Sequence, residues 1–305
     1  MYRDENRGIF WSKFYMKART VLVYTVLILL SFLCLITLYL LIVNATKDHL
    51  TLYKPLPKND KWVVLRTGVS FGKNFGHIFT KGINGFEQKY NVNFVTALGN
   101  SLIVAIGATF CSVYFSTVVA YGIHMYRFKL RNAAFTFILV IMMIPTQVST
   151  TGFVAMCYKF NWIDHLFVLI IPAVASPVTF FYIKQYMESV LPFEMVEAAR
   201  VDGAGEIRIF HQIVLPVLKP ALAVQIIFAF VGSWNNYFVP QLVLGKSSKR
   251  TLPIVVASLW NASNGSKDYG LIYMVIFVAI IPLTIVYFAF SRYIMKGLTL
   301  GAVKG

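Results

Sequence analysis

The stretch EAARVDGAGEIRIFHQIVLPVLKP, residues 197–220, is a charged and amphipathic interruption in an otherwise apolar chain. It contains three acids, two arginines, one lysine and two prolines, between segments with almost no charge. Just before it, Pro192 suits the first turn of a helix, where its missing N–H costs nothing. Asp202-Gly203 ends this helix, because glycine readily adopts the left-handed conformation past a helix C-terminus. The sequence therefore predicts a short helix over residues 192–202 and a turn at Gly203.

A second short helix is predicted directly after this turn. Ile207, Phe210 and Val214 recur at a spacing that places them on one face of an α-helix. Leu215-Pro216 stops this helix, and Pro220 opens the next long apolar segment. Two short helices joined by a glycine turn could lie on lipid, but such a hairpin needs a basic polar face and large apolar anchors. The first helix instead carries acids and small alanines, which favours docking to another protein.

The composition of the whole chain is that of a membrane protein. Of its 305 residues, 58% are hydrophobic and 13% are charged, whereas soluble domains carry about 25% charge. The net charge of +16 does not indicate a nucleic-acid-binding protein, because the basic residues are scattered and form no compact domain. A basic membrane protein facing anionic lipid explains the charge better. The three cysteines lie in apolar segments and predict neither a disulfide framework nor a metal site: Cys34, Cys111 and Cys157.

Six segments have the length of about 20 apolar residues that a helix needs to cross a membrane. They are Val21–Val43, Thr96–Ile123, Ala133–Cys157, Ile163–Tyr186, Ala221–Leu244 and Leu271–Tyr293. The first is longer than the 7–15 apolar residues of a signal peptide, so we expect it to be retained. The sequence thus predicts an all-α, polytopic membrane protein. Its expected parts are an N-terminal segment 1–20, a first transmembrane helix 21–43, an outer loop 44–95, a five-helix core 96–294 that includes the loop 188–220, and a C-terminal tail 295–305.

The short basic segments predict the orientation in the membrane. Five Lys or Arg residues precede the first span, and the turn Arg127-Phe128-Lys129-Leu130-Arg131 follows the second. Because two spans separate these basic segments, both segments lie on the same side of the membrane. Positive residues in short loops favour the cytoplasmic side. We therefore expect both termini and the loop 188–220 inside the cell, with the loops 44–95 and 245–270 outside.

The residues quoted first resemble the EAA loop of binding-protein-dependent ABC importer permeases. That pattern is EAA, then DG three residues on, then I-x-LP, and each position is filled: Glu197, Ala198, Ala199, Asp202, Gly203, Ile213, Leu215 and Pro216. Met143-Ile144-Pro145-Thr146 and Ser233-Trp234-Asn235-Asn236-Tyr237 resemble the sugar-importing branch. The ending Gly297–Gly305 is similar to that of the smaller, six-span permease subunit of maltose-type importers. The 44–95 loop has no such likeness.

The resemblance implies a type I ABC importer permease fold, in which the first short helix enters a cleft of a cytoplasmic ATPase subunit. Glu197 would pair with basic residues there. The residues implied in this coupling are Glu197, Ala198, Ala199, Asp202, Gly203, Phe210, Leu215 and Pro216. The tail residues Gly301, Ala302, Val303, Lys304 and Gly305 would reach toward the ATPase dimer interface. The implied partners are a sister permease, an ABC ATPase dimer and an extracytoplasmic sugar-binding protein or lipoprotein, at the cytoplasmic membrane of a bacterium.

The chain itself lacks the pattern of an ATP site. Gly245-Lys246-Ser247 is the nearest match, but a Walker motif needs a glycine five positions earlier, where this chain has Pro240. The chain is therefore expected to be no enzyme and to bind no cofactor or metal, with ATP and Mg²⁺ on the partner ATPase.

Uncharged polar groups within the spans are candidates for the substrate path. They are Gln147, Ser149, Thr150 and Thr151 after Pro145, where we expect a broken helix turn, and Gln225, Ser233, Asn235 and Asn236 in the fifth span. Amides and hydroxyls beside aromatic rings suit a neutral polyol, and the expected absence of buried Arg, Lys, Asp and Glu argues against ionic substrates. The favoured path residues are Gln147, Thr150, Trp234, Asn235, Asn236 and Tyr237. Alternatively, any of these polar side chains could instead form contacts between helices.

The expected function is import of a carbohydrate, such as an oligosaccharide, through half of a path that this chain forms. A permease for another neutral solute is an alternative. A self-sufficient secondary transporter should show inverted repeats and a titratable group at mid-membrane, and neither is found. A membrane enzyme has no support, since His124 and His165 lack catalytic partners at a suggestive spacing.

Overall fold

The computed structural model describes residues 2–53, 65–79, 93–261 and 267–302, and the side chains of 15–52 and 267–293 within the first and last of these ranges. These residues form helices and connecting turns, without a strand, as the all-α prediction requires. Of the predicted elements, much of the outer loop (54–64 and 80–92) and the tail residues Val303–Gly305 lie outside the described residues. The chain divides into two compact units, residues 1–76 with 267–277 and residues 77–266 with 278–305.

The first unit is built around the C-terminal end of the long helix α1 (Tyr2–Ala45). It also contains α2 (His49–Tyr53), the start of α3 (Phe71–Phe79) and the start of α16 (Tyr269–Ala302). The side-chain amide of Asn74 donates to the carbonyls of Ala45 and Lys47, at 2.9 and 2.8 Å. Because a helix leaves its last carbonyls without partners, Asn74 stabilises the end of α1.

Gly270 lets α16 begin directly against this end of α1. A Cβ at Gly270 would lie 2.3 Å from the carbonyl oxygen of Lys47, so no larger residue fits without a shift of the backbone. Beside it, the rings of His49 and Tyr269 stack at 5.7 Å. Residues far apart in the sequence thus form one small unit.

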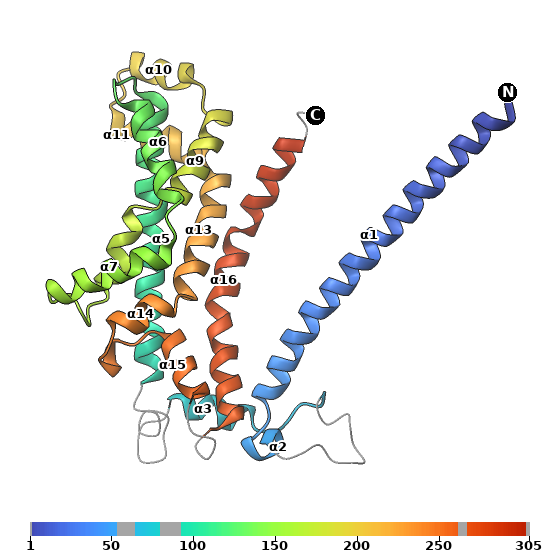
Figure 1. The fold of residues 1–305 in the computed structure, drawn as a ribbon, viewed down its shortest axis with the longest axis vertical. Helices are drawn as coiled ribbons and strands as arrows, with labels where there is room; N and C mark the ends of the chain where they lie inside the picture. The colour runs from blue at the N-terminus through green and yellow to red at the C-terminus, as the bar shows by residue number, and fades with distance from the viewer. Residues whose placement is uncertain (1, 54–64, 80–92, 262–266, 303–305) are drawn as a thin grey trace. The chain divides into compact units, whose positions relative to one another are not determined.

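The second unit packs around α5 (Phe94–Met125), against which α9 (Pro177–Val190) and α13 (Lys219–Trp234) lie (Figure 1). Small residues line the buried side of α5 and let the other helices approach closely. The hydroxyls of Ser112 and Thr179 lie 3.1 Å apart, and Ser116 donates to the carbonyl of Ser176 at 3.2 Å. Packing of small side chains and interhelical hydrogen bonds therefore hold this core together.

The other helices of the second unit are shorter. They are α6 (Arg131–Met142), α7 (Thr146–Lys159), α8 (Phe167–Ile170) with the 3₁₀ turn η2 (Ile171–Val174), α10 (Phe193–Val201), α11 (Glu206–Ile209), the π-helical turn η3 (Phe210–Val214), α12 (Leu215–Val217), α14 (Phe238–Val243), the 3₁₀ turn η4 (Ser247–Lys249) and α15 (Leu252–Trp260).

Four helical segments are long and apolar enough to span a membrane: Tyr15–Ala45, Phe94–Met125, Phe167–Val190 and Tyr269–Tyr293. Two bent pairs raise this number to as many as six in the described residues. One is α6 with α7, bent by 94°, and the other is Glu206–Val217 with α13, bent by 82°. Six spans are thus compatible with the structure, and α7 projects sideways from α6 (Figure 1).

Three predicted spans differ from the observed helices. The third is broken at Pro145, as expected of a residue that cannot donate a backbone hydrogen bond, so it is two helices rather than one. The fourth begins at Phe167 rather than Ile163, because Asn161 and Asp164 adopt left-handed conformations, with φ of 55° and 65°. The fifth is divided into α13 and α14 by the residues 235–237.

Candidate functional site

The two-helix module, residues 192–220, lies at one end of the second unit. Figure 1 shows α10 and α11 at the end opposite α14 and α15, with the C-terminal part of α16 running toward the same end as the module. Gly301 and Ala302 belong to the last turn of α16. The module is thus presented at the end of the helix bundle.

The turn at Gly203 has the geometry that the sequence predicted. Gly203 has φ +80°, and Asp202 is the C-cap of α10. The N–H of Gly203 donates to the carbonyl of Arg200, and the N–H of Ala204 donates to that of Ala199, both at 3.0 Å. These two bonds define a Schellman motif, which requires a left-handed residue at this position. The start of α10 differs slightly, since Pro192 is its N-cap and Phe193 its first residue.

The second helix of the module differs from the prediction in its buried face. Phe210 and Val214 are buried as expected, but Ile207 is 79% exposed and Ile209 is fully buried in its place. The cause is the π-helical turn Phe210–Val214, where the N–H of Leu215 donates to the carbonyl of Phe210, five residues back. A π turn shifts the phase of the helix, so the α-helical spacing used for the prediction does not apply.

The module has an inner and an outer face. Val196, Ala199, Ile209, Phe210 and Val214 pack into a core with α5 and α9. The outer face exposes Glu197, Ala198, Asp202, Gly203 and Pro216 together with Val201, which is 88% exposed. The predicted coupling residues are therefore split: most face outward, whereas Ala199 and Phe210 anchor the module to the bundle.

The polar candidates for the substrate path do not gather in one pocket. On α7, Gln147, Ser149 and Thr151 are exposed, and the Thr150 hydroxyl donates to the carbonyl of Thr146 at 2.8 Å. Trp234 is buried, and its Nε1 donates to the carbonyl of Ala279 at 3.1 Å. Trp234 therefore joins α13 to α16.

The break between α13 and α14 leaves Asn235, Asn236 and Tyr237 exposed. A small cavity touches this break, and its polar lining comes from Ser101, Ser233, Asn236 and Thr251. Gln225 is buried in α13. Of the predicted path residues, Gln147 and those at the break keep accessible polar groups.

The sequence argument assumed that the spans hold no buried charged residue. Lys184 shows that this assumption is wrong. It lies in α9 and is 7% exposed. Its ammonium group pairs with Glu188, one turn along the helix, and lies 4.3 Å from the centre of the Phe135 ring. The argument against ionic substrates is therefore wrong in its premise, although this lysine already has a carboxylate partner. The four-residue spacing of Lys184 and Glu188 was the signal that could have revealed the pair.

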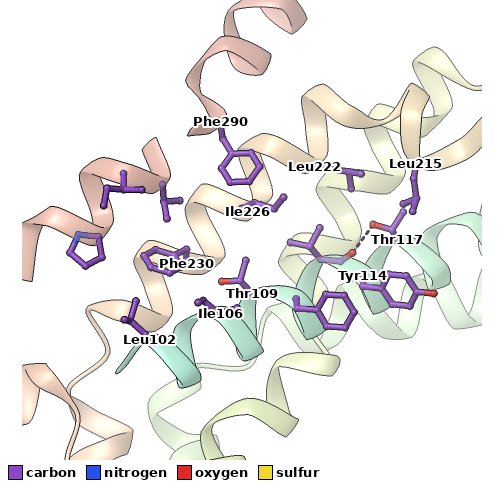
Figure 2. A pocket seen from close by; sticks show the side chains of 15 residues that line it. Leu102, Ile106, Thr109, Tyr114, Thr117, Leu215, Leu222, Ile226, Phe230 and Phe290 are labelled. Carbon is purple, nitrogen blue, oxygen red and sulfur yellow. Dashed lines mark hydrogen bonds between the residues drawn. The ribbon is translucent and has the colours of Figure 1, made fainter. Parts of the chain in front are cut away.

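A large groove in the second unit has a different character. It has a volume of about 650 Å³ and is lined by apolar side chains of α5, α13 and α16, among them Ile106, Phe230 and Phe290 (Figure 2). Of its few hydroxyls, that of Thr117 donates to the carbonyl of Val113 in its own helix, at 2.6 Å. Because a sugar needs several polar partners, this groove does not suit a carbohydrate.

The histidines singled out in the sequence are engaged with the backbone. A ring nitrogen of His124 lies 3.0 Å from the carbonyl oxygen of Leu191, and one of His165 lies 2.9 Å from that of Ile163. Across the described ranges, no three His, Cys, Asp or Glu side chains are placed to hold a metal ion.

Comparison with protein families identifies the chain. Residues 112–299 match the family described as binding-protein-dependent transport system inner membrane component, and this segment contains the two-helix module. The chain belongs to this family. The resemblance drawn from the EAA pattern is thereby confirmed, and the protein is a multi-pass transport permease of the inner-membrane type.

Named relatives in this permease family agree with the assignment. The arabinooligosaccharides transport system permease protein AraQ of Bacillus subtilis (strain 168) is 36% identical over 68% of this chain and 72% of that protein. The lactose transport system permease protein LacG of Rhizobium radiobacter is 31% identical over 75% of this chain and 82% of that protein. The sn-glycerol-3-phosphate transport system permease protein UgpE of Yersinia enterocolitica is 29% identical over 90% and 94%.

A solved structure shares the fold of this permease. It is the crystal structure of a bacterial ABC transporter involved in the import of the acidic polysaccharide alginate. The likeness has a TM-score of 0.72 over 90% of this chain and 96% of that chain, at 20% sequence identity. The predicted fold class, an ABC importer permease built from membrane-spanning helices, is thus confirmed.

Proposed function

We propose that this permease forms half of the path by which an ABC importer brings a carbohydrate into the cell. A sister permease forms the other half, an external binding protein or lipoprotein delivers the sugar, and a separate ATPase dimer supplies the energy. The observation that carries the proposal is the two-helix module, a hairpin with a Schellman turn that is presented at the end of the bundle. This module is the part of the chain suited to be displaced by a partner protein.

The chemistry of the module supports docking to protein rather than to lipid. Its outer face combines acids, a small alanine and the exposed valine Val201. An interfacial helix would instead offer basic residues to anionic headgroups. We therefore place the module in the cytoplasm, with both termini, and let α10 enter the ATPase, with Glu197 paired to its basic residues.

The transport cycle then follows from differential binding. ATP favours the closed ATPase dimer, and the docked modules move with it, so that the helices shift from an inward-open to an outward-open arrangement. The tail Gly301–Gly305 reaches toward the ATPase dimer. ATP and Mg²⁺ act on the partner, and this chain performs no chemistry.

The substrate class rests on the relatives and on the exposed polar groups. AraQ and LacG are named for an oligosaccharide and a disaccharide, and the break between α13 and α14 exposes two asparagines and a tyrosine, a combination that suits a polyol. Gln147 and Thr150 on α7, with Asn235, Asn236 and Tyr237, are the proposed path residues. The relative UgpE, named for a phosphorylated polyol, makes sn-glycerol 3-phosphate the competing substrate to test.

The test is uptake by the complete complex in proteoliposomes. The chain, its sister permease, its ATPase and its binding protein should accumulate labelled arabino-oligosaccharide or lactose with ATP, and a catalytically inactive ATPase should abolish uptake. The chain alone should move no sugar. Movement of sugar by the chain alone would identify a secondary transporter, and ATP-driven uptake of glycerol 3-phosphate without oligosaccharide uptake would replace the substrate class.

A further inference from the structure

A cluster of polar side chains ties the two-helix module to the end of α5. The guanidinium Nε of Arg200, in the last turn of α10, donates to Oε1 of Glu206 at 2.8 Å. The phenol of Tyr121, on α5, donates to Oε2 of the same carboxylate at 2.9 Å. Both oxygens of Glu206 are thus used, one by each neighbouring element. Glu206 is the first residue of α11, so a single side chain joins three helices.

Aromatic rings hold the members of this cluster in place. Tyr121 is 6% exposed, and its ring lies 5.7 Å from that of Phe210 and 6.0 Å from that of Tyr126. The Arg200 guanidinium lies 5.4 Å from the centre of the Tyr126 ring, within the range of a cation–π contact. The Tyr121 hydroxyl is therefore fixed by packing, and the arginine is fixed on both of its sides.

The charge state of Glu206 agrees with this geometry. The hydrogen bond from Arg200 is the largest cause that lowers the pKa of Glu206, to about 2, and it also raises the pKa of Arg200. The carboxylate is therefore ionised at physiological pH. An exposed ion pair contributes little by itself, and Arg200 and Glu206 are partly exposed. What distinguishes this pair is the second hydrogen bond to Glu206, which the buried Tyr121 donates.

The cluster sits at the point where the module is weakest. The residues between α10 and α11 include Gly203 and Gly205, and glycine resists bending least. Helix α11 has only four residues before the π turn, which is too short to be stable without tertiary contacts. A load applied to α10 would hinge at these glycines unless another contact joined the two helices across the turn. The Glu206 cluster is such a contact.

We propose that Glu206 is a positioning residue for energy coupling, which locks α10 and α11 to α5 so that a displacement of α10 moves α5. This inference rests on the proposed function, because it concerns how the ATPase drives the permease. The path residues proposed above play no part in this inference.

The test compares Glu206→Gln and Tyr121→Phe with the wild type in the reconstituted complex. Both variants keep the shape of the side chain and remove one part of the cluster. We expect each variant to assemble with the ATPase and to hydrolyse ATP. The ratio of sugar molecules imported to ATP hydrolysed should fall by at least about five-fold, which is the lower end of typical coupling effects. Tyr182→Phe, which removes the hydroxyl of an exposed tyrosine on α9, should behave as the wild type.

A double variant separates positioning from a general loss of structure. If Tyr121 acts through its hydrogen bond to Glu206, the combined Tyr121→Phe and Glu206→Gln change should lower the ratio no further than Glu206→Gln alone. A normal ratio in both single variants would overturn the inference, as would variants that no longer retain the ATPase on size-exclusion chromatography. A wild-type complex without ATP-driven uptake would instead overturn the proposed function, so the two failures are distinguishable.

Discussion

Gly203 is the residue whose conformation the function of the module depends on most directly. At φ +80° a Cβ would crowd the following carbonyl, at a cost of about 1–2 kcal/mol for an ordinary residue and more for a β-branched one. The Schellman bonds from Gly203 and Ala204 exist only in this conformation. Gly205, two residues on, has φ −69°, which any residue adopts.

We therefore predict that Gly203→Val abolishes ATP-dependent uptake while the protein still inserts in the membrane. Gly205→Val is the matched control, because the space beside Gly205 is open and its backbone is extended, and it should retain most uptake. Transport and membrane content are measured together. Normal uptake by Gly203→Val would show that the turn is not needed in this form.

The ionisation of Glu206 gives a pH prediction. Its pKa falls from the ordinary 4.5 to about 2 in the folded protein. A lowered carboxyl pKa contributes stability that is fully present above about pH 4.5 and is lost as the pH falls toward 2. The difference in melting temperature between the wild type and Glu206→Gln should thus stay constant from pH 5 to 8 and shrink below about pH 4.5. A difference that changed between pH 6 and 7 would contradict this assignment.

Single residues also show what the sequence could and could not reveal. Gly203 was predictable because local backbone sterics decide its role. Lys184 was missed because its burial is compensated by Glu188 and the Phe135 ring, and the second of these contacts depends on tertiary structure. Trp234 was singled out for the substrate path, and the hydrogen bond from its indole to α16 could not be predicted because it depends on the tertiary fold.

At the scale of elements, departures from regular helix determine where side chains point. The π turn Phe210–Val214 moves the buried face from Ile207 to Ile209, and the break at Pro145 directs α7 away from α6. A periodicity of 3.6 residues carries no information about either event. Propensity and hydropathy predicted that these segments are helical, and the tertiary fold decides their phase and direction.

The π turn predicts a ranking of two neighbouring substitutions. Ile209→Ala removes a fully buried side chain and should cost about 2–5 kcal/mol, whereas Ile207→Ala should change stability by less than about 0.5 kcal/mol. Thermal unfolding of the purified chain in detergent measures both. Greater destabilisation by Ile207→Ala would favour the regular α-helix that the sequence suggested.

At the scale of the whole molecule, the sequence predicts the length of the continuous helices best, and of the two bends it predicts only the one at Pro145. Three predicted spans lie within the continuous helices α1, α5 and α16. Helix α13, with 16 residues, is only about 24 Å long, less than the ~30 Å of the hydrocarbon layer. Helix α13 alone is therefore too short for a crossing, and its neighbouring residues have to contribute to the fifth span.

The proposed orientation predicts which loops a reagent can reach from outside the cell. In a variant without Cys34, Cys111 and Cys157, a cysteine at Lys249 should react with a membrane-impermeant thiol reagent on intact cells. A cysteine at Arg208, on the two-helix module, should react only after permeabilisation. Both positions are exposed in the structure. The reverse pattern would place the module outside and end the ATPase-docking proposal.

The contact between Gly270 and the end of α1 has a consequence for the order of biosynthesis. About 220 residues separate the two segments, which a ribosome adds in roughly 10–45 s at 5–20 residues per second. During that interval α1 is already made, while the glycine that closes against Lys47 and the tyrosine that stacks on His49 are not. The first unit is therefore completed only when translation is nearly over, after most of the second unit has been synthesised.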